Sequence, residues 1–154
     1  MLPIKKLSDT VSASGWLEAG DFAGVKALGF DTVINFRPDN EARDQIPSAE
    51  AEAAAKAAGL GYAHIPLTRH DLFTDEAIAK AEAAFQSGKR VLGYCASGQR
   101  VAVVWAAGRA RHEPVNDVLG AVSAAGFRLD AIRDDLEAQA DRARWSGGKA
   151  GAAA

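Results

Sequence analysis

A single cysteine stands where a nucleophile could act. Cys95 follows an apolar segment, Arg90 to Tyr94, that is typical of a β-strand, and it precedes a helix-forming segment. The four residues that separate it from Arg100 are Ala96, Ser97, Gly98 and Gln99. In a strand-to-helix loop of this kind the backbone N–H groups converge on one point and bind an anion. The sequence therefore predicts an oxyanion-binding loop that contains a thiol.

The residue types in this loop favour nucleophilic chemistry. Arg100 carries a planar fork of donors that suits phosphate or sulfate, and together with the positive helix end it favours the thiolate form of Cys95. Gly98 permits unusual backbone angles and close approach of a ligand, while Ser97 either donates to the thiolate or stabilises the turn. The alternative interpretations are a buried, unreactive cysteine and an arginine held in a structural ion pair.

Strand-forming and helix-forming segments alternate along the chain. We expect strands near 11–15, 32–36, 61–66 and 90–94, and helices near 17–28, 48–58, 74–85, 101–111, 114–125 and 129–144. Ser48 and Thr74 are the expected N-caps of two of these helices. The pattern predicts an α/β fold with a mostly parallel central sheet flanked by helices, in which ligands bind at the carboxyl ends of the strands. Residues 1–144 are expected to form one domain and 145–154 a disordered tail.

Composition narrows the function classes. The chain has 154 residues, of which 48% are hydrophobic, and a net charge of -2. This balance gives no general attraction to nucleic acid or to a membrane surface, so an anion site has to be local. One cysteine and three histidines without ligand spacing predict no metal, no cofactor and no disulfide. Without a signal peptide or an apolar span, the chain is expected to be cytoplasmic.

Three linked motifs carry a resemblance to a known family. They are Val33 to Asp39, Tyr62 to Pro66, and Tyr94 to Arg100. From about Leu7 to Ile132 the chain resembles the bacterial phosphatase-like domain that occurs alone or attached to beta-lactamase hydrolase-like proteins, a relative of the dual-specificity cysteine phosphatases. The resemblance implies a cysteine-phosphatase-like fold and a hydrolase of phosphomonoesters, with phosphotyrosine among the candidates. Its substrate would be a phosphorylated small molecule or a phosphoprotein.

The resemblance also implies roles for individual residues. Cys95 would attack phosphorus to form a cysteinyl phosphate, while Arg100 and the amides of residues 96–99 hold the oxygens. Asp71 is the candidate general acid, because it lies in the loop after a strand that neighbours the cysteine strand. Asp39 is the rival acid, and Asp75 is a weaker one because it falls in the first turn of a helix. Arg37 either reaches the anion or ties down its own loop through Glu41 or Asp39.

Two features depart from the phosphatase pattern. Five residues usually separate the cysteine from the arginine, whereas here four do, as in the loop of rhodanese-type sulfurtransferases. Val101 also replaces the hydroxyl residue that assists breakdown of the phosphatase intermediate. Two alternatives therefore stay open, a sulfurtransferase that uses a Cys95 persulfide and a non-catalytic oxyanion-binding module. The chain lacks the Gly-His-Ile-x-Gly-Ala segment of rhodanese domains, so we favour the phosphatase.

Overall fold

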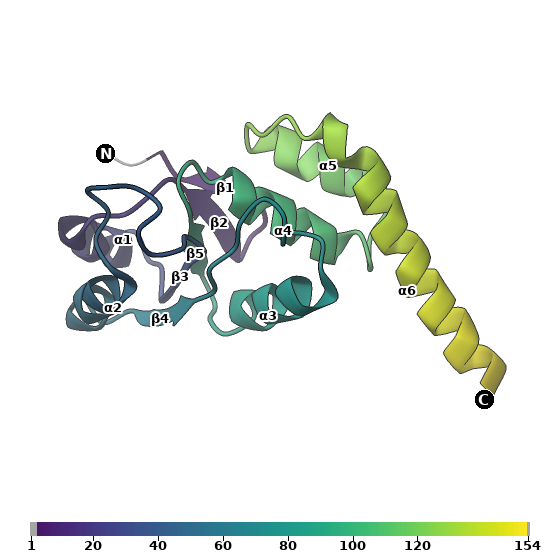
Figure 1. Cartoon of the computed structure of the whole chain (residues 1–154), viewed down its shortest axis with the longest axis horizontal. Coiled ribbons are helices and arrows are strands. Elements are labelled where there is room, and N and C mark those ends of the chain that lie inside the picture. The colour runs from purple at the N-terminus through teal and green to yellow at the C-terminus, as the bar shows by residue number, and fades with distance from the viewer. Residues whose placement is uncertain (1–2, 154) are drawn as a thin grey trace.

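The computed structural model describes the backbone of residues 3–153 and the side chains of residues 3–144. Its centre is a five-stranded sheet in the order β1-β2-β5-β3-β4 (Figure 1). The strands are β1 (Lys5–Lys6), β2 (Val11–Ser14), β3 (Thr32–Asn35), β4 (Gly61–His64) and β5 (Val91–Tyr94). β1 pairs antiparallel with β2, and the other neighbours are parallel. The predicted mostly parallel sheet is confirmed, and the two-residue edge strand β1 is an addition that the sequence pattern is too short to indicate.

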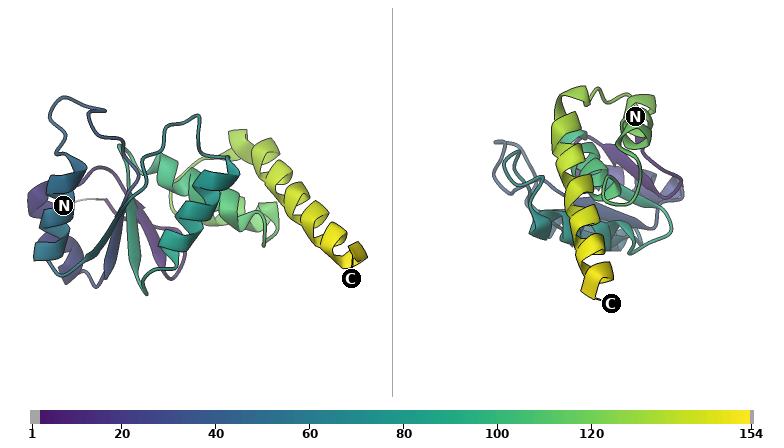
Figure 2. Two further views of the ribbon diagram at one scale, coloured as in Figure 1. Left: turned by 60° about the horizontal axis from the view of Figure 1, so that its bottom comes forward. Right: turned by 90° about the vertical axis from the view of Figure 1, so that its right-hand side faces the viewer.

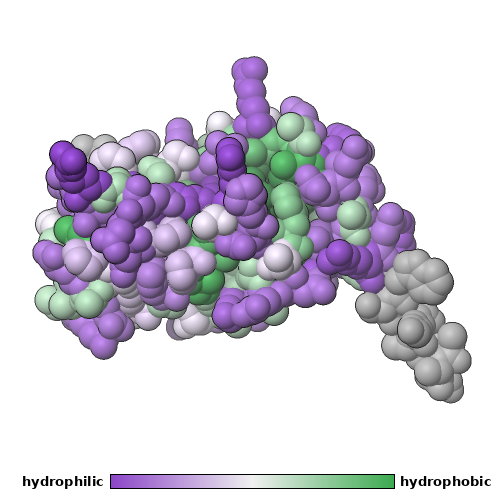
Figure 3. Space-filling view, viewed as in Figure 1, coloured by the Kyte–Doolittle hydropathy of each residue, from purple (hydrophilic) through white to green (hydrophobic). Residues whose placement is uncertain are grey.

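Helices cover both faces of the sheet. They are α1 (Phe22–Ala27), α2 (Ser48–Ala57), α3 (Asp75–Phe85), α4 (Gln99–Arg109), α5 (Val115–Ala124) and α6 (Arg133–Ala153), with short 3-10 turns at Ala19–Asp21 and Asp130–Ile132. Figure 2 shows α1 and α2 on one face, α3 and α4 on the other, and α5 and α6 outside α4. On the face shown in Figure 3, apolar surface is exposed mainly over α4 and α5, and the rest is largely hydrophilic.

The neighbouring strands β3 and β5 are buried on both sides. Val33 of β3 and Leu92 of β5 pack with Phe22 of α1. The adjacent residues of the same strands, Ile34 and Val91, pack on the other face, toward α3 and α4. Successive side chains of a strand point to opposite faces, so each strand contributes to both cores. This explains why the strands read as continuous apolar runs, as parallel strands covered by helices do.

Some element boundaries differ from the prediction. The helix expected at 17–28 is shorter, because Glu18 and Asp21 form a capping box that fixes a 3-10 turn before α1. Ser48 is wrong as an N-cap: Pro47 occupies that position, and the Ser48 hydroxyl lies 2.7 Å from the hydroxyl oxygen of Tyr62. Thr74 does cap α3 as predicted, since its hydroxyl accepts from the Ala77 N–H at 3.2 Å.

The C-terminal segment extends further than expected. The helix predicted at 129–144 begins as a 3-10 turn and continues as α6 to Ala153. The side chains from residue 145 onward lie outside the described residues, so the disordered tail at 145–154 stays a prediction. Among the described residues, none of the helices combines the length and the apolar character that crossing a bilayer requires.

Candidate functional site

The carboxyl ends of three parallel strands place the predicted loops together. Tyr94 of β5 is in register with Ser14 of β2 on one side and Asn35 of β3 on the other. Cys95 follows directly, and its N–H donates to the Ser14 carbonyl at 3.4 Å. The Phe36 N–H donates to the Tyr94 carbonyl at 2.9 Å, which brings the loop after β3 to the same edge. The sheet thus sets the loop after β3 beside the cysteine loop.

A left-handed glycine shapes the cysteine loop. Gly98 is the N-cap of α4 with φ of 91°, and its N–H donates to the sulfur of Cys95 at 3.1 Å. A Cβ at this position would lie 3.3 Å from the backbone carbon and oxygen of Ser14, so a side chain here would be strained by the backbone angle and crowded by Ser14. The chain therefore folds back over the sulfur at the start of α4.

Several N–H groups around the sulfur are available to an anion. In the described part of the chain, the N–H groups of Ala96 and Ser97 have no hydrogen-bond acceptor. Those of Arg100 and Val101 belong to the first turn of α4, where no intrahelical carbonyl can accept them. The Ser97 hydroxyl accepts from the Gln99 N–H at 3.4 Å, which is the turn-stabilising role of the two predicted for it. The loop is a cradle of donors at a helix N-terminus.

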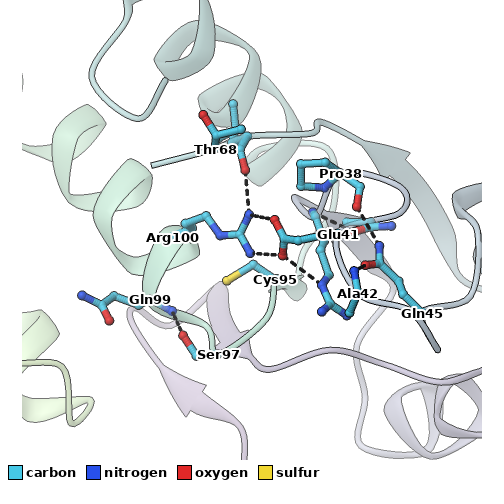
Figure 4. A network of polar contacts seen from close by, with 12 residues as sticks. Pro38, Glu41, Ala42, Gln45, Thr68, Cys95, Ser97, Gln99 and Arg100 are labelled. Carbon is cyan, nitrogen blue, oxygen red and sulfur yellow. Dashed lines mark hydrogen bonds and ion pairs between the residues drawn. The ribbon is translucent and has the colours of Figure 1, made fainter. Parts of the chain in front are cut away.

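Glu41 holds Arg100 in a defined orientation. The Nη1 and Nη2 atoms of Arg100 donate to the two carboxylate oxygens of Glu41 at 2.8 and 2.6 Å, and Nη1 also donates to the Leu67 carbonyl at 2.8 Å. These contacts use three of the five guanidinium N–H bonds. The remaining two, on Nε and Nη2, lie side by side along one edge of the plane. Figure 4 shows the sulfur of Cys95 next to this guanidinium. A phosphoryl or sulfuryl group can accept both free donors at once.

Glu41 also joins Arg100 to a second arginine. Its carboxylate accepts from Nε of Arg37 at 3.0 Å. The hydrogen bond from Arg100, with a smaller contribution from Arg37, holds the pKa of Glu41 below its ordinary value. In return, the hydrogen bond to Glu41 raises the pKa of Arg100. The sequence indicates Glu41 only as a partner of Arg37. Its bond to Arg100 spans 59 residues, and no local pattern signals it.

Arg37 has a structural position. Its side chain is only 6% exposed, and its guanidinium lies 5.1 Å from the centre of the Trp16 ring. Its backbone N–H donates to the Asn35 side chain at 2.9 Å, and its carbonyl lies 2.8 Å from Nε2 of His64. A cavity lies between the cysteine loop and the loop before α3, and Arg37 is not part of its wall. Of its two predicted roles, the contacts support the one that ties down the loop.

The three aspartates considered as acids lie outside this cavity wall. The Asp71 carboxylate accepts from the N–H and the hydroxyl of Thr68 at 3.1 and 2.9 Å, and chiefly the N–H contact lowers the pKa of Asp71. Asp39 accepts from the Ser48 N–H at 2.8 Å at the start of α2. Asp75 forms ion pairs with Arg111, in the turn after α4, and with Arg142 of α6. Each carboxylate has a structural partner.

The predicted nucleophile, Cys95, lies just behind the cavity. Cys95 is 1% exposed, and the adjoining wall is formed by Ala96, Ser97, Gln99 and Arg100. Val101 is fully buried, and a Cβ on Gly93 would lie 2.7 Å from its Cγ1. The residue that replaces the expected hydroxyl therefore belongs to the packing between β5 and α4. Within the described residues, no three His, Cys, Asp or Glu side chains come together in a way that could hold a metal ion.

Comparison with known proteins places this site in a family. Residues 3–112 match the family model described as "Beta-lactamase hydrolase-like protein, phosphatase-like domain". The chain belongs to this family. A beta-lactamase hydrolase-like protein of Xylella fastidiosa (strain 9a5c) is 30% identical over 142 residues, which are 89% of this chain and 32% of that protein. The chain spans about a third of the length of the curated relatives it matches.

Solved structures of similar fold agree with the family. A candidate phosphatase of Neisseria meningitidis Z2491 superposes with a TM-score of 0.81 at 28% identity, over 90% of this chain and 99% of that one. Pseudomonas aeruginosa TpbA, solved in complex with pTyr, gives a TM-score of 0.56 at 19% identity, over 88% and 81% of the two chains. This phosphatase-like domain has the fold of the cysteine phosphatases, as the sequence predicted.

Proposed function

We propose that this phosphatase-like domain hydrolyses phosphomonoesters through a cysteinyl-phosphate intermediate on Cys95. The observation that carries the proposal is the orientation of Arg100. Glu41 and the Leu67 carbonyl engage three of its donors, and the free pair lies next to the sulfur and the loop amides. Donors fixed in advance around a developing negative charge are the main means by which such sites lower a barrier.

The chemistry has two steps. The Cys95 thiolate forms a bond to phosphorus while the ester P–O bond breaks, and the leaving oxygen takes a proton. Water then attacks phosphorus, the S–P bond breaks, and inorganic phosphate and the thiolate are released. In both steps the N–H groups of Ala96 and Ser97 and the free edge of Arg100 hold the non-bridging oxygens.

The general acid predicted for the first step is Asp71. The hydrogen bonds from Thr68 favour the ionised carboxylate, and the side chain is directed into its own turn. These contacts support a role for Asp71 in holding the 68–71 turn rather than in donating a proton. A comparison of leaving groups, described in the Discussion, separates the two roles.

A second function is favoured by one observation, the four-residue spacing between Cys95 and Arg100. In a sulfurtransferase the thiolate would take the outer sulfur of thiosulfate, releasing sulfite and leaving a persulfide. The persulfide would then pass that sulfur to cyanide, giving thiocyanate and the thiolate. A third possibility, a module that binds oxyanions without turnover, follows from the absence of a hydroxyl at Val101.

The deciding experiment measures p-nitrophenyl phosphate hydrolysis by the wild type and by Cys95→Ser in reducing, metal-free buffer. We expect many turnovers per wild-type molecule and none for the serine variant. Wild-type activity no higher than that of Cys95→Ser would overturn the proposal. Thiocyanate formation from thiosulfate and cyanide would then identify the sulfurtransferase, and phosphate binding without either activity would identify the binding module.

The proposed substrate is a phosphorylated small molecule or a phosphoprotein. The pTyr bound to TpbA supports this class, since that protein shares the fold. The cytoplasmic location expected from the sequence stays a prediction, which fractionation of the native host tests directly.

A further inference from the structure

A cavity of about 500 Å³ opens beside the cysteine loop. One side is formed by the start of α4, with Gln99, Arg100 and Val103. The other is formed by the loop before α3, with Thr68, Arg69, His70 and Leu72. Its volume lies within the range of about 300–1,000 Å³ that is typical of small-ligand pockets. The part of a substrate beyond the phosphoryl group would occupy this space.

The cavity wall carries a cation that the reaction does not use. Arg69 is exposed and lines the cavity, and it has no carboxylate partner within 4 Å among residues 3–144. His70, beside it, lines the same wall. The one acidic residue of the wall, Glu41, is engaged by Arg37 and Arg100. The wall is therefore locally positive, although the whole chain has a net charge of -2.

The turn that presents this cation is held by hydrogen bonds. The Asp71 carboxylate accepts from Thr68, and the Asp71 N–H donates to the Thr68 carbonyl at 3.1 Å. The Thr68 hydroxyl accepts from the His70 N–H at 3.3 Å, and the Thr74 hydroxyl donates to the Asp71 carbonyl at 3.0 Å. Fixing the backbone reduces the entropy that ordering the turn around a ligand would cost.

The apolar part of the same wall is aliphatic. Its apolar members are Leu72, Val103 and Ala96, and it contains no Phe, Tyr or Trp. The exposed Trp16 lines a different cavity together with Arg37 and Arg43. A flat aryl group would find aliphatic contacts here, and its stacking partners would be limited to the His70 imidazole and the guanidinium groups of Arg69 and Arg100.

We propose that Arg69, assisted by His70, forms a second anion subsite, and that the substrate is a phosphomonoester with a second anionic group. This inference rests on the proposed phosphatase function, because it places the reacting phosphoryl group at Cys95 and Arg100. The second group is a phosphate or a carboxylate, which the exposed guanidinium can bind through paired donors.

The test compares matched substrates. We would measure kcat/KM for 3-phosphoglycerate against glycerol 3-phosphate, for fructose 1,6-bisphosphate against fructose 6-phosphate, and for a doubly against a singly phosphorylated peptide. We expect the wild type to prefer the compound with the additional anion about tenfold, or ~1.4 kcal/mol, in at least one pair. The pair that shows the preference identifies a small molecule or a peptide as the source of the group.

Two variants test whether Arg69 causes the preference for the additional anion. Arg69→Gln is expected to reduce the ratio to below about threefold, while the control Arg43→Gln, which removes an exposed arginine from the other cavity, keeps it. Equal loss in both variants would show a general charge effect and overturn the subsite. Retention of the preference in Arg69→Gln, or its absence in a wild type that hydrolyses p-nitrophenyl phosphate, would also overturn it. No hydrolysis of p-nitrophenyl phosphate at all would instead refute the phosphatase function.

Discussion

Replacing Glu41 by glutamine tests whether this carboxylate orients Arg100 for catalysis. The substitution keeps the shape of the side chain but leaves one oxygen acceptor where the carboxylate has two. The amide nitrogen would face a guanidinium donor, so the paired contacts at 2.8 and 2.6 Å could not both form. Arg100 would lose the constraint that directs its free edge toward the Cys95 loop.

The size of the effect follows from the bonds that are lost. Hydrogen bonds to charged groups are worth about 1.5–3 kcal/mol each, so loss of one orienting bond predicts a fall in kcat/KM of roughly 10- to 100-fold. The fold is also weakened, because the largely buried Arg37 loses its carboxylate partner. Since Glu41 is partly exposed to water, we expect the free energy of unfolding to fall by about 1–3 kcal/mol, less than for a fully buried pair.

The assay is p-nitrophenyl phosphate hydrolysis, with each rate divided by the folded fraction from urea unfolding. Glu52→Gln is the matched control, because Glu52 lies on α2 in an exposed pair with Lys56 at 3.6 Å. It should change the free energy of unfolding by less than about 1 kcal/mol and leave kcat/KM unaltered. Wild-type kcat/KM in Glu41→Gln would refute the orienting role.

A double-mutant cycle shows whether Glu41 acts through Arg100. Arg100→Lys keeps the charge but removes the planar fork. If Glu41 works by holding that fork, Glu41→Gln should have little further effect on kcat/KM in the Arg100→Lys background. Additive losses, in which both substitutions lower kcat/KM independently, would contradict the coupling derived from the structure.

Three further predictions concern the turn, the loop and pH. Asp71→Asn should lower kcat/KM for p-nitrophenyl phosphate and for an alkyl phosphate by the same factor, since the contacts assign Asp71 to its turn; a loss confined to the alkyl substrate would restore Asp71 as the acid. Gly98→Ala should lower the free energy of unfolding by about 1–3 kcal/mol in a urea titration, because alanine is strained at φ of 91° and its Cβ would press on Ser14; an unchanged midpoint would be inconsistent with this backbone. The folded-state pKa of Glu41 is depressed below its ordinary 4.5, chiefly by Arg100, so its stabilisation is present above pH 4.5 and is lost as the pH falls through the folded value. The difference in unfolding free energy between wild type and Glu41→Gln should therefore shrink between pH 5 and pH 3, and a constant difference would refute the assignment.

Local sequence signals predict the parts of the site that are close together along the chain. The apolar run before Cys95, the small residues after it and Arg100 lie within one strand-loop-helix unit, so their order specifies the loop. The left-handed Gly98 and the N-terminal turn of α4 follow from the same short stretch. The parallel sheet was also predictable, because strand and helix segments alternate and the segments of β3 and β5 are mostly apolar at successive positions.

The tertiary structure determines which groups the polar residues of the site contact. Glu41 and Arg100 are 59 residues apart, and they meet because β3 and β5 are neighbours whose carboxyl ends share one edge. The amino-acid order indicated Glu41 as a candidate partner of Arg37, four residues away, but it did not indicate the contact of Glu41 with Arg100 or of Asp71 with Thr68. A carboxylate can satisfy a guanidinium, a helix start or its own turn at similar energetic benefit. The tertiary packing selects among these options, because it fixes which donors lie within hydrogen-bonding distance of each oxygen.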